Sequence, residues 1–391
     1  MGPCPRSPSP AASPHVANVG IKDDSDDFVV IAAERPCTAA AMFTRSRFAG
    51  PSVVLSRDHA ADGVLQAIVV VSKNANVATG AQGAANAAEL SAGVAAALDC
   101  DPRDVLVAST GVIGRQYPMD RIRSHLASLQ APLADTDAMD AARAMMTTDT
   151  HPKVATASVA TVDGGTASIV GIAKGVGMIE PDMATMLAFV LTDADVPLME
   201  LEEGFAHAVE RSFNSLSVDT DTSTSDTAAL LASGAAGGVE PHDFNLALQA
   251  VCLDLTRQLA ADGEGATKLL VVEVHGARDD AQARAVAKSI VNSPLVKTAV
   301  HGADPNWGRV AMAIGKVDDD DIDQDRVRIS FGDHEVYPAT VDEHGLAALE
   351  EYLRGDEVHI GAELGIAHGH WAVYGCDLSD GYVRINADYT T

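Results

Sequence analysis

Short apolar runs that alternate with helical patterns constrain the fold of this chain more than any other feature of its sequence. The strongest runs, LQAIVVVS at 65–72 and KLLVVEVHG at 268–276, have the length and composition of buried strands. Runs and helical patterns are interleaved without strict βαβ alternation, which favours an α/β (α+β) fold of mixed sheets in layers with helices outside. Predicted strands lie at 26–33, 51–56, 65–72, 104–109, 167–173, 185–194, 268–276, 309–316, 326–331, 371–375 and 382–386, and predicted helices at 80–99, 119–129, 136–146, 198–213, 243–261, 279–291 and 342–354.

The composition narrows the classes of partner. The chain has 391 residues, 47% of them hydrophobic, so it can bury a large core as two domains or one large α/β unit. It carries 27 Lys and Arg against 55 Asp and Glu, a net charge of −28. Such a surface repels phosphate backbones and anionic lipid, so we expect no nucleic acid and no membrane as partner. No apolar run approaches the roughly 18 residues of a membrane helix, and we expect a cytoplasmic protein.

The cysteines and the N-terminal stretch exclude several further classes. The five cysteines are scattered and form no CxxC pair or His/Cys cluster, so the sequence predicts neither a disulfide framework nor a metal site. The stretch MGPCPRSPSPAASPHV lacks the apolar core of a secretory signal. Its Pro- and Ser-rich composition predicts a disordered leader over residues 1–20.

The bond between Ala184 and Thr185 stands at the head of an apolar run, TMLAFVLTDA, after the corner GVGMIEPDM. A threonine at the start of a strand is common, because its β-branched side chain suits strands. A small residue before that threonine, at the end of a tight corner, is also the arrangement of self-cleaving N-terminal nucleophile proteins. There the threonine oxygen attacks the preceding carbonyl, and water then releases a new α-amine. This amine has a pKa of about 7.7–8.0, so it can act as the base for its own hydroxyl.

Three glycine-containing corners place polar groups beside strands. The segment STGVIG at 109–114 can direct one side-chain O–H and one backbone N–H at a common point, as an oxyanion requires. Lys174, in GIAKGVG, could bind an acidic substrate group, although an isolated lysine is more often a surface residue. Glu264, between two glycines in DGEGATK, could cap a loop or bind an amine.

Two segments that suggest a metal or a nucleotide do not fit those sites. In DTDTSTSDT at 219–227, an EF-hand would need Gly and Glu at its sixth and twelfth positions, where this chain has Thr224 and Leu230. The row of hydroxyls and carboxylates suits either a hydrogen-bonded turn or a turn that lines a polar pocket. GIAKGVG lacks the residue order of a phosphate-binding P-loop. We therefore predict no cofactor.

These motifs together resemble the glutamate N-acetyltransferase family, the ornithine acetyltransferases. KGVGMIEPDMAT is the most diagnostic stretch, and the resemblance runs from about residue 28 to the last residue. The matching stretches, in order, are ASTGVIG, TTDT, GIAKGVGMIEPDMAT, FNSLSVDTDTSTSDT, DGEGATK, NSPLVKTA, HGADPNWGR and GYVRINADYTT.

The resemblance implies a self-cleaving enzyme with a layered αββα sandwich, similar in its layers to N-terminal nucleophile hydrolases. Members cut themselves before the threonine that matches Thr185. Here this would yield an α chain, residues 21–184 after the leader, and a β chain, residues 185–391, which stay together as an α2β2 heterotetramer. In a ping-pong cycle of arginine biosynthesis, the acetyl group of N2-acetyl-L-ornithine passes to that threonine and then to L-glutamate.

The family's functional residues transfer to matching positions of this sequence. Thr185 is the implied nucleophile, Ala184 precedes the cut, and Thr110 with Gly111 forms the oxyanion hole. Within TTDT at 147–150, Thr148 or Thr150 could take the place of Thr147. The implied substrate-binding residues are Thr147, Lys174, Thr185, Glu264, Asn386 and Thr391.

Two stretches depart from the family pattern, and two other functions stay open. VSKNANV at 71–77 has Lys73 where members have glycine, and FTRSRFAGPSVV at 43–54 is closer to paralogues of antibiotic pathways such as that of clavulanic acid. One alternative is an N-terminal nucleophile aminopeptidase or amide hydrolase, which passes the acyl group to water. Lys174 and Glu264 count against it, because they suit an amino-acid zwitterion. The other alternative is a non-catalytic paralogue that binds an acylated amino acid.

Overall fold

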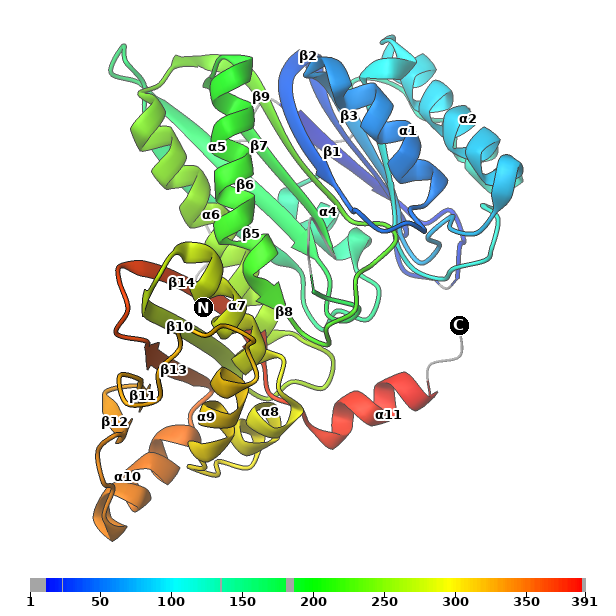
Figure 1. Cartoon of the computed structure of the whole chain (residues 1–391). Coiled ribbons are helices and arrows are strands. Elements are labelled where there is room, and N and C mark those ends of the chain that lie inside the picture. Colours follow the sequence, from blue (N-terminus) through cyan, green and yellow to red (C-terminus); the bar gives the residue numbers. More distant parts are fainter. Residues whose placement is uncertain (1–11, 23, 134–135, 181–185, 389–391) are drawn as a thin grey trace, which may run out of the picture.

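The computed structural model describes residues 12–22, 24–133, 136–180 and 186–388. The described residues form a mixed α/β structure with an eight-stranded and a six-stranded sheet (Figure 1). Three residues that the sequence singles out, Ala184, Thr185 and Thr391, lie outside the described residues.

The larger sheet contains parallel and antiparallel pairs, as the interleaved pattern predicts. Strands β7 and β9 are parallel, whereas β6 is antiparallel to both β5 and β7. Its strand order is β4-β3-β2-β9-β7-β6-β5, with β1 paired to β2. The strands are β1 (Ala12–Ala17), β2 (Phe28–Phe43), β3 (Val64–Val71), β4 (Val105–Ser109), β5 (Lys153–Ala160), β6 (Thr166–Lys174), β7 (Leu187–Asp195) and β9 (Thr227–Gly238).

The long strand β2 divides this sheet into two layers. Its first part pairs with β1 and β3 and its last part with β9, and the register against β3 breaks between Ala32 and Cys37. One hydrophobic cluster contains Ile31 from the first layer together with Phe189 and Leu231 from the second. The neighbouring strand residues, which face the other way, belong to two different clusters. The sheet therefore folds over on itself around a shared core, to which α4 (Ala138–Met145) also contributes.

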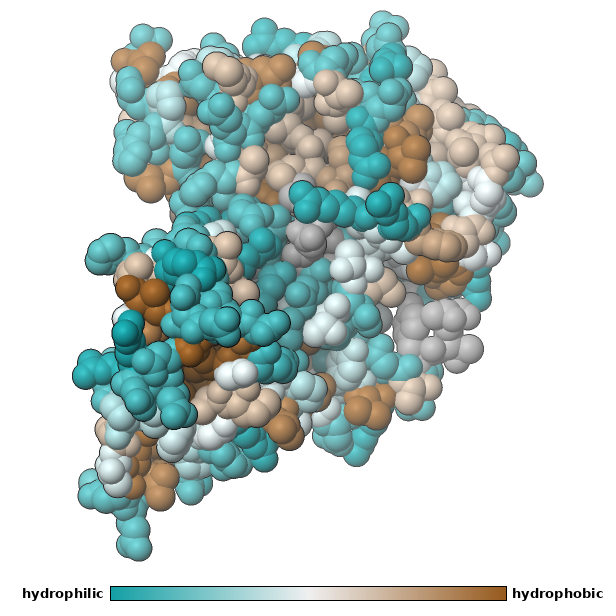
Figure 2. Space-filling model, viewed as in Figure 1, coloured by the Kyte–Doolittle hydropathy of each residue, from teal (hydrophilic) through white to brown (hydrophobic). Residues whose placement is uncertain are grey.

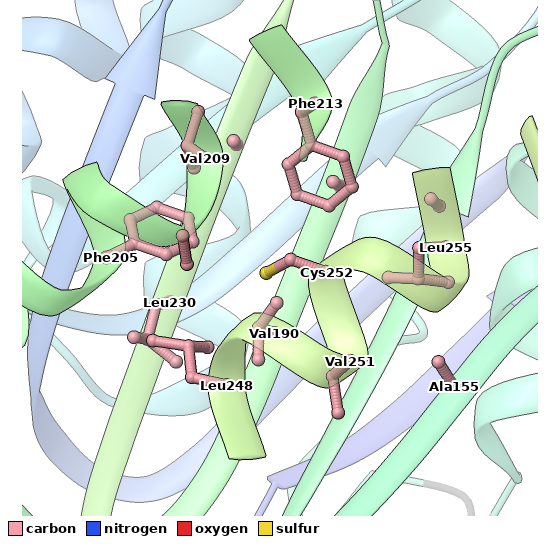
Figure 3. Close-up of a cluster of buried hydrophobic side chains, with 14 of the residues drawn as sticks. Ala155, Val190, Phe205, Val209, Phe213, Leu230, Leu248, Val251, Cys252 and Leu255 are labelled. Atoms are coloured by element: carbon pink, nitrogen blue, oxygen red, sulfur yellow. The ribbon is translucent and has the colours of Figure 1, made fainter. Parts of the chain in front are cut away.

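Helices cover the outer faces of both layers. On the first layer, Phe28 and Val30 pack with α2 (Gly80–Leu98) and α3 (Met119–Leu126). On the second layer, Val190 and Leu230 pack against α5 (Leu198–Arg211) and α6 (Pro241–Ala261), whose aromatic and aliphatic side chains interdigitate (Figure 3). The order helix, sheet, sheet, helix confirms the predicted αββα layers.

The smaller sheet forms a second unit on the far side of α6 (Figure 1). Leu269 and Val271 of β10 join the cluster of α6, whereas Leu270 and Val272 face α7. The helix α7 begins where the Asp279 carboxylate accepts the N–H of Gln282. The strand order is β12-β11-β13-β10-β14-β8. The elements of this unit are β8 (Leu216–Ser217), β10 (Leu269–Ala277), α7 (Asp280–Val291), α8 (Pro294–His301), α9 (Gly308–Gly315), β11 (Arg328–Phe331), β12 (His334–Tyr337), α10 (Glu343–Leu353), β13 (Glu357–Glu363) and β14 (Gly369–Cys376).

Three predicted strands are helices. The run at 51–56 lies in α1 (Pro51–His59), where Pro occupies the first turn and the Ser56 hydroxyl donates to the Val107 carbonyl of β4. The run at 309–316 lies in α9, because its buried residues follow a helical spacing of three and one. The run at 382–386 lies in α11 (Asp380–Asp388), where an Arg384–Asp380 ion pair spans one turn. A short apolar run therefore does not distinguish a strand from a helix.

Part of the predicted leader is ordered. Residues 12–17 form β1, which pairs antiparallel with β2 from Ala12 opposite Ala33 to Ala17 opposite Phe28. The prediction of disorder over 1–20 is wrong for this segment. The alternation of Ala12, Pro14 and Val16 with polar neighbours suits an edge strand, where proline costs no ladder hydrogen bond.

The surface and the cysteines agree with the composition. The face drawn in Figure 2 is mostly hydrophilic, with hydrophobic side chains in small groups. No helix within the described ranges is long and apolar enough to span a membrane.

Burial raises the pKa of the Cys252 thiol, which lies among the side chains of Figure 3, to about 12, and that of Cys37 to about 11. Neither thiol is a candidate nucleophile.

Candidate active site

The corner after β4 contains Thr110 and Gly111, the two residues that are predicted to form an oxyanion hole. Gly111 adopts φ +127°, and a Cβ atom there would lie 2.3 Å from the carbonyl carbon of Lys73. Only glycine fits this position without moving the backbone. Within the part of the chain that the structure describes, no hydrogen bond is recorded from the Gly111 N–H. This N–H and the hydroxyl of Thr110 therefore form a pair of donors at one strand end.

Lys174 joins this corner from the end of β6. Its ammonium group donates to the hydroxyl of Thr147 at 2.8 Å and to that of Thr110 at 3.3 Å. Its side chain is only 8% exposed. Because Lys174 donates to the Thr110 oxygen, the hydroxyl proton of Thr110 is directed away from Lys174. Thr110, Thr147 and Lys174, which the sequence predicts as site residues, thus form one group.

Glu264 is the centre of a second group. Its Oε1 accepts the hydroxyl of Thr148 and its Oε2 accepts the side-chain amide of Asn386, each at 2.9 Å. Its backbone N–H donates to the carbonyl of Val176 at 2.7 Å. A Cβ at Gly177 would lie 2.5 Å from this carboxylate, so the glycine-rich corner after β6 lets Glu264 approach.

The TTDT segment joins the two groups. Thr147 contacts Lys174 and Thr148 contacts Glu264, so neighbouring residues lie at the cationic and the anionic end of the site. Thr150 instead donates to the carboxylate of Asp262. Of the three candidate threonines, Thr150 is therefore the one that contacts neither charged group of the predicted site.

A buried charge network that no motif predicts lies beneath this segment. The Lys153 ammonium donates to Asp149 Oδ1 at 2.8 Å and to Asp262 Oδ2 at 2.6 Å, and its side chain is 0% exposed. Burial alone would raise the pKa of Asp149, but the charges of Lys174 and Lys153 and the N–H of Gly175 lower it to about 2. A lysine at the first position of an apolar strand is the only local signal of this network.

A second buried carboxyl, Asp226, lies directly before β9. The following N–H, that of Thr227, donates to the carbonyl of Met186 at 3.0 Å, so Asp226 is close to the chain that follows residue 185. Its Oδ2 is buried without a hydrogen-bond partner among the described residues. Burial raises the pKa of Asp226 well above its usual value, although a hydrogen bond with Ser223 and the charge of Lys174 oppose this rise. The uncharged form is favoured.

The chain that leads into residues 181–185 is held by many hydrogen bonds. Asp219 accepts the backbone N–H groups of Met178 and Ile179, both at 2.7 Å. Asp219 is the first residue of the segment 219–227, which the sequence predicts as a polar turn. This segment therefore supports the chain that precedes residue 181. The Glu180 carboxylate accepts hydrogen bonds from side chains of the second unit and of β8, namely Lys288, Asn292 and Ser217.

This arrangement supplies groups for acyl chemistry. A hydroxyl and a backbone N–H can stabilise an oxyanion, while Lys174 and Glu264 can bind the charged ends of an amino acid. No cluster of three or more metal-ligating side chains occurs among the described residues. Thr185, the predicted nucleophile, and Thr391 lie outside those residues, and their roles stay predictions.

Comparisons with known proteins extend over the whole of this architecture. The ArgJ family profile matches residues 13–391. "Glutamate N-acetyltransferase Oat2" of Streptomyces clavuligerus is 57% identical over 384 residues, which are 96% of this chain and 96% of that protein. "Arginine biosynthesis bifunctional protein ArgJ" of Rhodococcoides fascians is 52% identical over 397 residues, 99% of this chain and 96% of that protein. A crystal structure of the arginine biosynthesis bifunctional protein argJ from Bacillus halodurans is 40% identical, with a TM-score of 0.48, and covers 50% of this chain and 96% of its own.

These matches confirm the family resemblance that the motifs carry. The family profile spans almost the entire chain, and the two relatives are aligned over nearly their full length. The chain therefore belongs to the ArgJ family.

Proposed function

We propose that this chain is a self-processing glutamate N-acetyltransferase, which transfers the acetyl group of N2-acetyl-L-ornithine to L-glutamate. The S. clavuligerus relative is named for this activity and the R. fascians relative for arginine biosynthesis. One structural observation carries the proposal. Thr110, Thr147 and Lys174 precede the predicted cut and Glu264 and Asn386 follow it, yet all belong to two adjacent hydrogen-bonded groups.

The first step is cleavage between Ala184 and Thr185. The Thr185 hydroxyl attacks the Ala184 carbonyl carbon, the C–N bond breaks, and its nitrogen receives a proton. Water then hydrolyses the resulting ester and frees the Thr185 hydroxyl and α-amine. The site draws residues from both sides of the cut, which supports fragments that stay together, as in the α2β2 heterotetramer that we propose.

Acetyl transfer follows the same chemistry. The Thr185 α-amine takes the hydroxyl proton, and the oxygen attacks the acetyl carbonyl of the donor. The oxyanion that forms accepts hydrogen bonds from the Thr110 hydroxyl and the Gly111 N–H. The C–N bond of the donor then breaks, its nitrogen takes the proton from the Thr185 α-amine, and ornithine leaves. Glutamate enters, its unprotonated amine attacks the acetyl carbonyl, the ester C–O bond breaks, and the Thr185 oxygen takes up the proton that the glutamate nitrogen loses.

The charged groups suit a site that binds two amino acids in turn. Lys174 binds a substrate carboxylate, and Glu264 with Asn386 and Thr391 faces the amine-bearing end. A hydrolase that passes the acyl group to water would have no need for both charges. We place the reaction in arginine biosynthesis in the cytoplasm.

Intact-mass spectrometry with N-terminal sequencing tests the cleavage step. We expect one piece that ends at Ala184 and one that begins at Thr185, whereas Thr185→Ala should stay whole and inactive. Thr166→Ala is the matched control, because Thr166 also follows a small residue at the head of a strand but is exposed. Two normal pieces from Thr185→Ala would refute the assignment.

Kinetics of Thr110 variants test the transfer step. Thr110→Val should lower kcat by about 10²–10³, because one donor to the oxyanion is lost. Thr110→Ser keeps the hydroxyl and should recover most of the rate. Consumption of N-acetylornithine must also depend on glutamate, since a hydrolase would consume it alone. A valine variant at full rate would show that this corner is only structural.

A further inference from the structure

Asp149 is the only carboxylate among the described residues that forms an ion pair with Lys174, and its position is unusual. Its Oδ2 lies 3.8 Å from the Lys174 nitrogen, beyond a hydrogen bond. The same oxygen accepts the backbone N–H of Thr147 at 3.1 Å. Its Oδ1 accepts the N–H of Gly175 and the ammonium of Lys153, both at 2.8 Å. Three hydrogen bonds thus hold the Asp149 carboxylate in this position.

At this distance Asp149 can stabilise the charge of Lys174 without occupying one of its N–H donors. The Asp149 charge stabilises the Lys174 ammonium through space, because both side chains lie in a medium of low dielectric constant. Asp149 takes none of the three N–H donors, two of which bind Thr147 and Thr110. Lys174 therefore keeps both its charge and a donor for a substrate oxygen.

The other charged groups that face Lys174 do not replace Asp149. Burial lowers the pKa of Lys174, and the charge of Asp149 is the largest influence that raises it. Lys153 lowers this pKa further, while Asp226 and Glu264 raise it less than Asp149 does. Burial raises the pKa of Asp226, which disfavours its charged form, and Glu264 is bound to Thr148 and Asn386.

We propose that Asp149 is a positioning residue for substrate binding, which keeps the Lys174 ammonium charged and free to bind the substrate carboxylate. Lys153 holds Asp149 at the distance that makes both possible. This inference rests on the proposed function, because it presumes a substrate that carries a carboxylate. Asp149 itself is covered by protein and does not contact the substrate.

The test is the pH profile of acetyl transfer in the full-length, self-cleaved protein. We expect kcat/KM for N-acetylornithine to rise with the deprotonation of the Thr185 amine and to fall as Lys174 loses its proton, which yields a bell-shaped curve. In Asp149→Asn the missing charge lowers the pKa of Lys174, so the alkaline fall should move down by about one pH unit. At a pH above this fall, kcat/KM should then be about tenfold lower, mainly through a higher KM.

Asp262→Asn is the matched control. Asp262 is as buried as Asp149 and shares Lys153 with it, but among the described residues its partners are Lys153, Thr150 and His151 and not Lys174. In Asp262→Asn the alkaline fall of kcat/KM should stay at the pH of the wild type. A wild-type profile for Asp149→Asn, or an equal displacement in both variants, would overturn the inference. If the wild-type protein did not transfer an acetyl group to glutamate at all, that result would instead contradict the proposed function.

Lys174→Arg provides a second test that does not depend on the folding of Asp149→Asn. A guanidinium group stays charged at every pH of the assay, so the alkaline fall should disappear. The double variant Asp149→Asn with Lys174→Arg should show no fall either. An alkaline fall retained in Lys174→Arg would overturn the inference, because Lys174 would then not be the group that titrates.

Discussion

Asp149 and Asp226 are two buried carboxyls that influence the same lysine, yet the protein shifts their pKa values in opposite directions. Asp149 has a pKa of about 2, whereas the pKa of Asp226 is raised well above its usual value. The two are 8% and 1% exposed, so burial does not explain the difference. The two carboxyls differ in their ion-pair and hydrogen-bond partners.

Asp149 has a lysine on each side and backbone N–H groups on both oxygens. Asp226 is bound by neutral donors, and its Oδ2 has no partner among the described residues. A carboxylate in a protein interior stays charged only where counter-ions and N–H donors replace its lost water. The difference shows that the network around β5 stabilises a charged carboxylate, whereas the surroundings of Asp226, directly before β9, disfavour one.

The largest effect is expected from Lys153→Met, which removes the shared counter-ion of Asp149 and Asp262. Two buried carboxylates would lose a partner, at a cost of about 3–5 kcal/mol in the free energy of unfolding. Urea denaturation followed by circular dichroism measures this loss. Lys316→Met, at the exposed end of α9, is the control and should change stability by less than about 0.5 kcal/mol. A loss below about 1 kcal/mol for Lys153→Met would mean that Asp149, like Asp226, does not depend on a charged hydrogen-bond partner.

Asp149→Asn should have an intermediate effect that depends on pH. The pKa of Asp149 falls from 3.8 to about 2 on folding, so its stabilisation is fully present above the unfolded pKa and is lost as the pH falls through the folded pKa. The variant should be less stable than the wild type by about 2 kcal/mol at neutral pH. The difference should narrow as the pH is lowered from about 5 towards 2. A constant difference across this range would contradict the assigned charge.

Asp226→Asn should show the opposite sign. The pKa of Asp226 is raised on folding, so the folded state must take up a proton above the unfolded pKa, and stability falls as pH rises. Asparagine removes this proton uptake. We expect the variant to match the wild type near about pH 4 and to exceed it near pH 8, by about 1 kcal/mol or less because its amide inherits the unpartnered position. A clear destabilisation at pH 8 would show that Asp226 is charged.

The smallest effect is expected for Lys73, a charge outside the buried network. Lys73 adopts φ +69°, and its ammonium donates to the Ser25 carbonyl at 3.0 Å near the surface. Lys73→Gly relieves the left-handed strain but makes the unfolded chain more flexible, so a gain of about 0.5 kcal/mol is expected. Lys73→Met removes the charge and keeps the strain, so its melting temperature by calorimetry should not rise. An equal gain in both variants would assign the effect to charge.

The sequence alone was sufficient for the family, and the resemblance named site residues whose roles stay predictions. Thr110, Thr147, Lys174, Glu264 and Asn386 were all predicted from motifs, and the structure brings them together in two adjacent groups. The αββα layers were predicted too. Motifs carry this information because the chemistry requires particular residues beside particular strand ends, and these requirements are local.

Tertiary structure alone decided the state of the charges and the form of several short elements. The short apolar runs of α1, α9 and α11 were predicted as strands, and packing accounts for two of the helices, since α1 contacts β4 and α9 contacts α7 and α8. Lys153 and Asp262 are 109 positions apart, and neither segment indicates which residue is the partner of the other. Whether the pKa of a buried carboxyl is lowered, as for Asp149, or raised, as for Asp226, depends on which donors and charges the fold places within about 4 Å of it, because electrostatic energy in a protein interior falls with distance in space and not along the chain.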